Sequence, residues 1–308
     1  MKQVAGNEGR AGRGTGRCRF RGSLVAIVTP FRDGEIDFEA FRALVDWHAE
    51  SGTDGLVVAG TTGEGATLTN EEKTRLFRAA VEDVRGRMPV VAGIGTNSTR
   101  TTVENARAAD ACGVDGLLVV TPYYNKPTPR GLVLHFSAVA EATKTPIVLY
   151  NVPSRTGVDM IPEVVTEVAG RFPHVVAVKE ALPSIERVKR LVAETGADVL
   201  CGDDASIADF MGLGAVGVIG VVNNVVPRQV AALVRAAAPG GDSARAANLV
   251  EEIAPLVRDL FLESNPGPVK AALAMLGRCR DELRLPLATL SEPNRKKLEA
   301  TVRAFARA

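Results

Sequence analysis

The sequence predicts an α/β protein built as a (β/α)8 barrel, a TIM barrel, with a helical region after the eighth strand. Short, near-continuous apolar runs recur along the chain at intervals of roughly 20 to 35 residues. Such runs are typical of strands that are buried on both faces. The segments between them carry apolar residues at three- and four-residue steps, as one face of a helix does. Eight repeats of this alternation predict a closed barrel.

The apolar runs are assigned to the barrel strands in chain order. They read LVAIVTP from Leu24, GLVVAGTTG from Gly55, VVAGIGT from Val90, GLLVVTP from Gly116, PIVLYNVP from Pro146, VVAVKE from Val175, DVLCGDD from Asp198 and AVGVIGV from Ala215. An open doubly wound sheet is the alternative. It would be expected to carry a glycine fingerprint after its first strand, where this chain has VTPFRDGE.

Helices are predicted between the strands and beyond the last one. Apolar residues at helical spacing include Phe38, Phe41, Leu44, Val45 and His48, and later Ile185, Val188, Leu191 and Val192. Capping residues stand at the helix entries: Asp37, Thr69 or Asn70, and Ser184. Further helical runs begin at Arg228, Ala244, Pro268 and Pro293. The predicted barrel therefore covers residues 23–240, and the C-terminal helical region covers residues 241–308.

Residues 1–22 differ in composition from the rest of the chain. Six basic residues stand there against Glu8 alone, and the remainder holds 31 basic and 35 acidic residues, a net charge of about −4. Glycine and arginine cannot bury enough apolar surface to order this stretch, so a disordered extension or a misassigned start is predicted. No apolar segment of a secretory signal follows it. A transit peptide would need more serine, and an RNA-binding arm would need more aromatic residues than Phe20.

The bulk composition argues against several classes of protein. No apolar run reaches the roughly 20 residues of a membrane span. The four cysteines lie far apart, which favours reduced thiols in the cytoplasm over a disulfide framework or a zinc site. The three histidines are also far apart, so a metal centre built on clustered imidazoles is not expected. We therefore expect no metal, no other cofactor, no nucleic-acid partner and no membrane partner.

Reactive and polar side chains gather where the predicted strands end. A lysine that ends a single strand is normally a solvated charge. In a barrel, however, active sites form at the carboxyl ends of several strands. The residues at these ends are Thr61 and Thr62 at strand two, Tyr123 and Tyr124 at strand four, Tyr150 and Arg155 at strand five, Lys179 at strand six, and Gly202 and Asp203 at strand seven. All three tyrosines of the chain are in this set, which makes Lys179 a candidate nucleophile.

A lysine in a barrel mouth can act as a nucleophile toward a carbonyl group. The amine must be neutral to attack, and removal of water disfavours its ammonium form. It can then form a Schiff base with a 2-oxo acid, and the iminium allows the neighbouring carbon to lose a proton and become an enamine. Hydroxyl groups can relay these protons, and Thr61, Tyr124 and Tyr150 have suitable chemistry. Backbone N–H groups of the GTTGEG loop can hold a small carboxylate, although a plain glycine turn is the alternative interpretation.

Five motifs give the chain a specific resemblance to a known family. GTTGE, TPYYNKP, YNVPSRTG, VVAVKEA and CGDD occur in this order within residues 22–280. They resemble the motifs of the dihydrodipicolinate synthase (4-hydroxy-tetrahydrodipicolinate synthase) family. That family belongs to the class I aldolase superfamily, which also holds N-acetylneuraminate lyase.

The resemblance implies a role for each matching residue. Lys179 would form the Schiff base with pyruvate, and L-aspartate 4-semialdehyde would be the second substrate, in the first committed step of diaminopimelate and lysine biosynthesis. Tyr150 would exchange protons, and Thr61 would link it to Tyr124. In the family this last tyrosine reaches in from a neighbouring subunit, which implies a homo-oligomer, usually a tetramer.

The resemblance also implies the substrate-binding residues. Thr62 would bind the pyruvate carboxylate, Arg155 would bind the carboxylate of the semialdehyde, and Gly202 and Ile219 would shape the pocket. Sialic-acid lyases and 2-keto-3-deoxy sugar acid aldolases share the lysine, the Tyr150 position and the threonine loop. These pyruvate aldolases are the alternative function. The arginine of YNVPSRTG, together with YYN, favours the dipicolinate branch.

Feedback inhibition by L-lysine is expected to be weak or absent. Ala66, Asn97 and Tyr123 match the cleft that holds lysine in inhibited family members. That type usually has histidines where this chain has Asn70 and Lys73, and a glutamate where it has Thr101. An added cation and a lost acceptor should weaken the binding of a cationic ligand.

Two other classes of function fit the sequence less well. A pyridoxal-phosphate enzyme would also use a barrel lysine, but it would need a phosphate cup and a partner for the pyridine nitrogen. A binding module descended from an enzyme would be expected to have lost catalytic positions, and here every position of the family pattern is filled.

Overall fold

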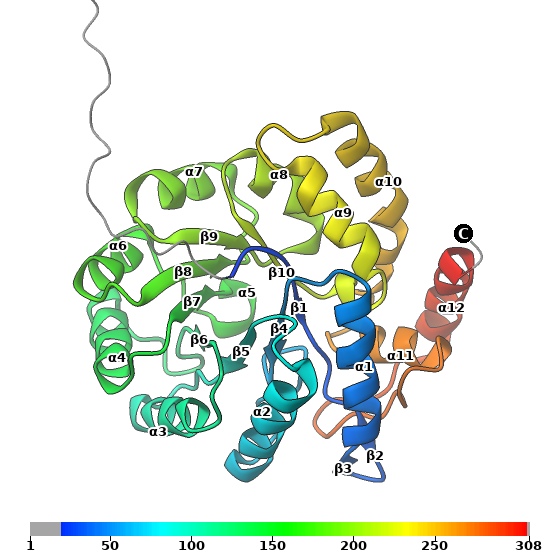
Figure 1. Ribbon diagram of the computed structural model, residues 1–308, viewed down its shortest axis with the longest axis horizontal. Helices are drawn as coiled ribbons and strands as arrows, with labels where there is room; N and C mark the ends of the chain where they lie inside the picture. Colours follow the sequence, from blue (N-terminus) through cyan, green and yellow to red (C-terminus); the bar gives the residue numbers. More distant parts are fainter. Residues whose placement is uncertain (1–19, 307–308) are drawn as a thin grey trace, which may run out of the picture.

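The structure, a computed structural model, describes residues 20–306. Eight parallel strands form a closed barrel in the order β1-β10-β9-β8-β7-β6-β5-β4, at the centre of Figure 1. Their bounds are β1 Gly22–Ala26, β4 Gly55–Val58, β5 Val90–Gly93, β6 Gly116–Val120, β7 Ile147–Asn151, β8 Val175–Glu180, β9 Asp198–Cys201 and β10 Gly217–Gly220. Each lies within one of the eight predicted apolar runs or differs from it by two residues at most. The predicted (β/α)8 barrel is therefore confirmed.

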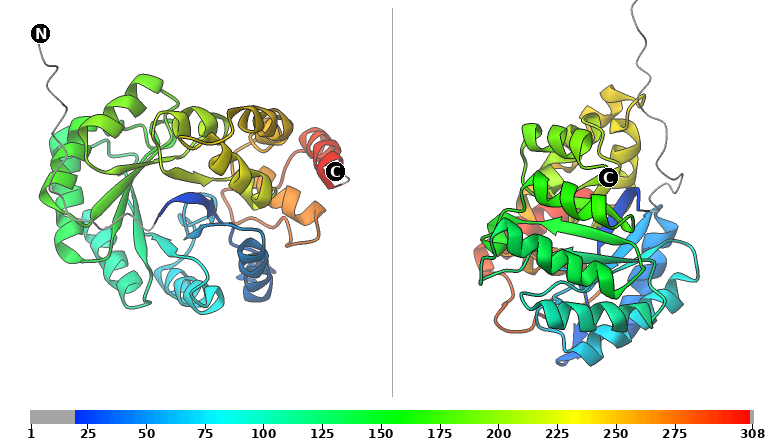
Figure 2. Two further views of the ribbon diagram at one scale, coloured as in Figure 1. Left: turned by 45° about the horizontal axis from the view of Figure 1, so that its top comes forward. Right: turned by 90° about the vertical axis from the view of Figure 1, so that its left-hand side faces the viewer.

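Helices surround the barrel, and a further set follows β10 (Figures 1 and 2). The surrounding helices are α1 Phe38–Glu50, α2 Asn70–Val84, α3 Thr99–Asp110, α4 Pro129–Ala142, α6 Pro162–Arg171, α7 Ile185–Glu194, α8 Ile207–Gly212 and α9 Pro227–Ala237. The C-terminal helices are α10 Ser243–Asp259, α11 Gly267–Met275 and α12 Glu292–Ala306. The small elements are the hairpin β2 Phe31–Arg32 and β3 Glu35–Ile36, the one-turn helix α5 Pro153–Thr156, and the 3₁₀ turns η1 Asp204–Ser206 and η2 Val222–Asn224.

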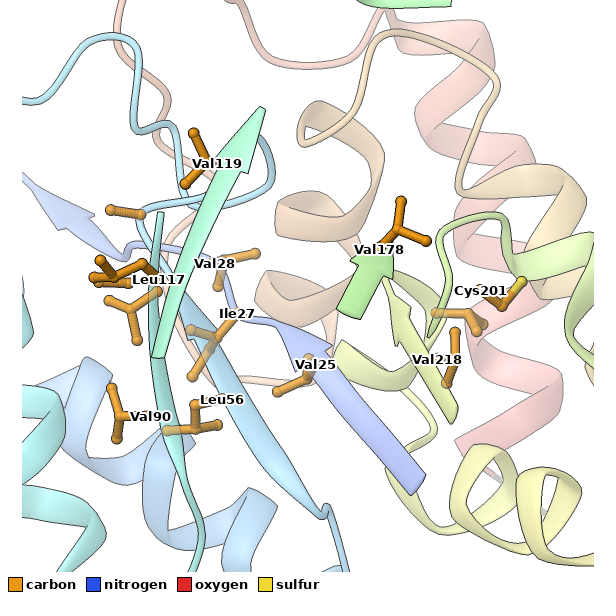
Figure 3. Close-up of a cluster of buried hydrophobic side chains, with 14 of the residues drawn as sticks. Val25, Ile27, Val28, Leu56, Val90, Leu117, Val119, Val178, Cys201 and Val218 are labelled. Carbon is orange, nitrogen blue, oxygen red and sulfur yellow. The ribbon is translucent and has the colours of Figure 1, made fainter. Parts of the chain in front are cut away.

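Each strand is buried on both faces because successive side chains point to opposite sides. Residues such as Leu24, Val57 and Ala177 form a cluster inside the barrel. Their neighbours, such as Val25 and Val178, pack outward beneath the helices, and several of these side chains are labelled in Figure 3. Both positions are apolar, which explains why the sequence shows near-continuous runs rather than alternation.

The predicted capping residues begin their helices as expected. The Asp37 side chain accepts from Ala40 N, and the Ser184 side chain accepts from Arg187 N. For α2 the cap is Thr69, which exchanges reciprocal side-chain and backbone hydrogen bonds with Glu72. The capping box places the first helical residue at Asn70.

The prediction that residues 1–22 form a disordered extension is wrong for the last residues of that stretch. Residues 1–19 lie outside the described part of the chain. Phe20, in contrast, is buried and belongs to the cluster inside the barrel. A Cβ on Gly116, the first residue of β6, would lie only 2.3 Å from Phe20 Cζ. The aromatic ring therefore fills the amino-terminal end of the barrel, and Gly22 already starts β1.

Within the described residues, no helix is both long enough and apolar enough to cross a membrane.

Candidate active site

A cavity of about 450 Å³ lies where the strands β4 to β7 end. Four segments from the barrel contribute to its wall: the loops after β4, β5 and β6, and the end of β7 with the turn that follows it. Five of the sequence-predicted site residues line it: Thr61, Ala66, Tyr123, Tyr150 and Arg155. This is the face of the barrel at which active sites form.

Lys179 does not line this cavity, but it contacts Tyr150, which does. Two residues before it, Ala177 belongs to the cluster inside the barrel, so strand alternation directs Lys179 inward as well. Its Nζ lies 4.3 Å from the centroid of the Tyr150 ring, because β7 and β8 pair these two residues in register. The lysine is only 5% exposed. A buried lysine facing a phenol is unusual outside functional sites.

Gly202 leaves the space that the Lys179 side chain needs. A Cβ at this position would lie 2.9 Å from Lys179 Cε and 3.0 Å from both Ala181 Cβ and the Glu180 carbonyl oxygen. Two of these three atoms belong to backbone or to a rigid side chain and cannot move away. Ile219, on β10, is fully buried and belongs to the same cluster as Tyr150.

The loop after β4 presents its two threonines differently. Thr61 is exposed to the cavity, whereas Thr62 is 2% exposed and its Oγ1 accepts from Asn265 Nδ2 at 3.0 Å. The loop is tight because a Cβ on Gly65 would lie 2.0 Å from the Ala59 carbonyl oxygen. Glu64 adopts a left-handed φ of 52° to complete the turn.

The predicted proton relay is only partly assembled within one chain. Thr61 and Tyr150 line the same cavity, but among the described residues no hydrogen bond joins Thr61 to either Tyr150 or Tyr124. Tyr124 is 89% exposed and does not line this cavity. It also has a left-handed φ of 73°, a conformation that is costly for a bulky residue and is typical of functional sites.

Arg155 lies in the one-turn helix α5 after β7 and reaches toward the C-terminal region. Its Nη2 donates to the Asn265 carbonyl oxygen at 3.4 Å. Thr156, the next residue, is buried and its hydroxyl lies within hydrogen-bond distance of the carbonyl oxygens of Val152 and Val158. These contacts hold the turn that carries the arginine.

The residues predicted for a lysine effector are partly brought together. Ala66 and Tyr123 line the cavity, and so does Lys73, whose pKa is lowered by burial. Asn97 does not line it, but its carbonyl oxygen accepts from Asn125 Nδ2 at 2.8 Å, close to the two tyrosines.

The sequence interpretation missed the part of the cavity wall formed by the C-terminal region. Asn265, Pro266, Pro286 and Leu287 line the cavity, although they follow the eighth strand by more than forty residues in the chain. The run ESNPGPVK signals a turn between two helices, but nothing in it shows where that turn packs.

A buried ion pair ties this region to the threonine loop. Lys270 Nζ donates to Glu64 Oε1 at 2.6 Å, and both side chains are fully buried. The other oxygen of Glu64 accepts from Arg284 N at 3.0 Å. Burial lowers the pKa of Lys270, and the facing carboxylate acts in the opposite direction.

Asp204 is a second buried acid that the sequence interpretation did not assign. Its carboxylate accepts from Val221 N and Val222 N at 3.0 to 3.1 Å, which fixes the turn after β10. Burial raises the pKa of Asp204 to about 6, while the two N–H groups and the nearby Lys179 lower it.

No group of three or more histidine, cysteine, aspartate or glutamate side chains in residues 20–306 is placed to hold a metal ion. The polar side chains that line the cavity are hydroxyls, the amide of Asn265, Lys73, Arg155 and the ion-paired Glu64. The Lys179 amine lies against the Tyr150 ring. This set suits Schiff-base chemistry and proton transfer on a small carboxylate substrate.

Comparisons with known proteins agree with this chemistry. The model of the dihydrodipicolinate synthetase family matches residues 19–305. The chain is 50% identical over 290 residues to the 4-hydroxy-tetrahydrodipicolinate synthase of Anaeromyxobacter sp. strain Fw109-5, covering 93% of this chain and 98% of that protein.

Solved structures of related proteins share the fold. The dihydrodipicolinate synthase of Aquifex aeolicus superposes with a TM-score of 0.91 at 44% identity, covering 93% of this chain and 98% of that one. The chloride-inhibited dihydrodipicolinate synthase of Acinetobacter baumannii, solved in complex with pyruvate, gives a TM-score of 0.89 at 42% identity, covering 92% and 98%.

Proposed function

Because the chain belongs to the dihydrodipicolinate synthetase family, we propose that it is a lyase that condenses pyruvate with L-aspartate 4-semialdehyde. The product would be 4-hydroxy-tetrahydrodipicolinate. The observation that carries this proposal is the buried Lys179 amine held 4.3 Å from the Tyr150 ring at the mouth of the barrel.

Lys179 performs the covalent chemistry. Its amine adds to the keto carbon of pyruvate, and water leaves to give an iminium. The iminium withdraws electrons from the methyl group, which loses a proton and becomes an enamine. The enamine carbon then attacks the aldehyde carbon of the second substrate and forms the new carbon–carbon bond, which restores the iminium on Lys179. The amino group of the second substrate adds to the iminium carbon, which closes the ring and expels the Lys179 amine.

Tyr150 moves the protons of these steps. Its ring lies against Lys179, and Tyr150 also lines the cavity. The same phenol can therefore exchange protons with pyruvate bound to Lys179 and with the second substrate. Thr61, exposed in the same cavity, passes protons onward. Tyr124 of a neighbouring copy completes the relay, which accounts for its exposure and its costly backbone conformation in a single chain.

The remaining residues bind the substrates. Thr62 and the N–H groups of its loop hold the pyruvate carboxylate, and Arg155 holds the carboxylate of the semialdehyde. Gly202 and Ile219 shape the pocket around Lys179. The enzyme works as a homo-oligomer, a dimer of dimers, in the cytoplasm.

L-Lysine is a weak inhibitor or none in this proposal. Lys73 lines the cavity beside Ala66 and Tyr123, so the ammonium groups of the effector would meet a cation there. Activity should stay essentially unchanged when L-lysine is titrated into the assay. Half-inhibition at low-millimolar concentration or below would contradict this.

A turnover assay tests the function. Purified protein is given pyruvate and L-aspartate 4-semialdehyde, and the product is detected by coupling to its reduction by a nicotinamide-dependent reductase. The proposal expects turnover with this aldehyde and little or none with N-acetylmannosamine or a sugar-derived aldehyde. The opposite preference would assign the protein to the sugar-acid aldolases.

A further inference from the structure

Strand β8 contains one extra residue near its start. Ile147 of β7 pairs with Val175 of β8. The next residue of β7, Val148, pairs with Ala177, so Val176 has no partner on β7. Such a bulge changes the face to which the following side chains point, and bulges are common beside active sites, where they redirect a side chain.

The bulge turns Lys179 into the barrel. Val175 belongs to the cluster outside the strands, whereas Ala177 belongs to the cluster inside the barrel and Val176 packs against that same cluster. Regular alternation resumes from Ala177, so Val178 packs outward and Lys179 points inward. Alternation counted from Val175 without the extra residue would place the lysine on the outer face, beneath the helices.

The apolar side chains of β8 do not determine this register. The four residues before Lys179 read VVAV, and both faces of the strand are covered. A slip of one residue would therefore exchange apolar side chains between two apolar environments. A pattern that is apolar on both faces specifies the register only weakly. The register has to be determined by polar contacts, and the first polar residue after the lysine is Glu180.

Glu180 is the centre of a buried hydrogen-bond network on the outer face of the sheet. Asn151, its register partner on β7, donates through Nδ2 to both carboxylate oxygens, at 3.0 and 3.1 Å. Leu182 N donates to Oε1 at 2.8 Å, and Arg187 Nε of α7 donates to Oε2 at 2.6 Å. Asn151 and Glu180 are both fully buried. Each carboxylate oxygen thus accepts from two donors.

A slip of the strand would break this network. It would turn Glu180 toward the barrel interior and leave Asn151 Nδ2 and Leu182 N without this acceptor. The Arg187 side chain, which is only 9% exposed, would lose its buried partner. Asn151 is held in place on β7 because its Oδ1 accepts from Met160 N at 2.9 Å. The hydrogen bonds therefore favour one register over its neighbours.

We propose that Glu180 is a positioning residue, whose bonds to Asn151 and Arg187 hold the bulged register in which Lys179 points into the barrel and faces Tyr150. The pairs Tyr150–Lys179 and Asn151–Glu180 are consecutive in the same two strands. A polar network outside the barrel therefore fixes the reactive pair inside it. The inference rests on the proposed function and adds to it the contacts that orient the nucleophile.

Glu180→Gln tests this role. Glutamine has the same shape, but either orientation of its amide places an NH₂ group against two donors. The rate at which pyruvate and borohydride modify Lys179, divided by the folded fraction from circular dichroism, should fall by about 100-fold, as for a misplacement of about 1 Å. A merely structural role would lower the folded fraction and leave the rate per folded molecule unchanged.

Asp259→Asn is the matched control. Asp259 is also a fully buried carboxylate that accepts from an arginine and a second donor, Arg258 Nε at 2.7 Å and Thr301 Oγ1 at 2.6 Å. It lies at the end of α10 and not on a barrel strand. Its substitution should lower stability and leave the rate of modification per folded molecule unchanged.

Two further variants keep the test decisive. Asn151→Asp combined with Glu180→Gln exchanges donor and acceptor between the strands, so its modification should be faster than that of Glu180→Gln alone. If Glu180→Gln does not fold, Arg187→Lys replaces it, because lysine keeps the charge and loses the Nε donor. It should show a smaller loss of the same kind.

The wild-type rate per folded molecule in Glu180→Gln or in Arg187→Lys would overturn the inference. So would a double variant that is modified no faster than a folded Glu180→Gln protein. If the wild-type protein itself forms no adduct with pyruvate, the proposed function is wrong, and the position of Glu180 is not the cause.

Discussion

Lys179 is held from two sides because its strand lies between those of Tyr150 and Gly202 in the closed barrel. On one side β7 brings the Tyr150 ring to 4.3 Å from the amine. On the other side the chain leaving β9 has no side chain where a Cβ would meet the lysine. The position of the Lys179 amine thus depends on the large side chain of Tyr150 and on the absence of a side chain at Gly202.

Replacing Gly202 by alanine should displace this nucleophile. The new Cβ would lie 2.9 Å from Lys179 Cε, and Ala181 and the Glu180 carbonyl block any shift of the backbone. We expect kcat/KM to fall by about 100-fold, the typical effect of a misplacement of about 1 Å. The measurement is steady-state kinetics together with a thermal melt.

The control for that variant is Gly170→Ala in α6, where an added Cβ meets nothing within 4 Å. It should keep full activity and gain a few tenths of a kcal/mol, because alanine favours the helix. Full activity in the Gly202 variant would show that the space around Lys179 is not needed.

At the scale of secondary-structure elements, the segment from Asn265 to Leu287 belongs to the active site as much as the barrel loops do. It contributes four residues to the cavity wall. The ion pair between Lys270 of α11 and Glu64 ties it to the loop that carries both threonines. The C-terminal region therefore supports the site and is not a mere appendage.

Replacing Lys270 by methionine should destabilise the protein by about 3 to 5 kcal/mol, because it leaves the Glu64 charge buried without its partner. The double variant Glu64→Gln, Lys270→Met removes both charges and should recover part of this loss. Urea unfolding of the two variants measures the difference. A single variant as stable as the wild type would contradict this account of the loop.

An element can be predicted from the sequence when residues close together in the chain determine it, and cannot be predicted when it depends on residues far apart in the chain. The strands were predicted because burial on both faces leaves a local apolar run. The lysine, the tyrosines and the threonines followed from the rule that barrel sites lie at strand ends. The contact of Asn265 with Thr62 joins residues 203 positions apart, and no local pattern encodes it.

Short elements also escaped the sequence interpretation. The hairpin β2–β3 and the one-turn helix α5 have four residues each, too few to show a period. Phe20 was assigned to a disordered extension because its glycine- and arginine-rich neighbours dominate the composition of that stretch. Only its place inside the barrel shows that it is a core residue.

At the scale of the whole molecule, the barrel is sealed at one end and open at the other. Phe20 fills the end where the strands begin, and the cavity occupies the end where they finish. Stability and chemistry are thereby separated along the barrel axis, as is usual for this fold.

Buried histidines should make the folded protein sensitive to acid. Burial lowers the pKa of His48 to about 3, and that of His135 to about 4. Below pH 6.5 the unfolded chain takes up protons that the folded chain refuses, so the free energy of unfolding falls as the pH falls. For His48 alone the loss from pH 6.5 to pH 4.5 is about 2 to 3 kcal/mol.

Asp204 has a raised pKa, so its contribution to the free energy of unfolding changes in the opposite direction over the same pH range. Comparison of the wild type with His48→Gln therefore isolates the contribution of His48. Chemical denaturation of both proteins at pH 7 and pH 4.5 gives the two differences. The wild type should lose more stability than the variant. Equal losses would show that His48 does not resist protonation in the folded state.

The central claim is that Lys179 forms an imine with pyruvate, and reductive trapping tests it most directly. The protein is incubated with pyruvate, reduced with borohydride, digested and mapped by mass spectrometry. We predict one pyruvate adduct, on the peptide that contains Lys179, and no adduct in the Lys179→Arg variant. An unmodified wild-type protein, or an adduct on another lysine, would contradict the account.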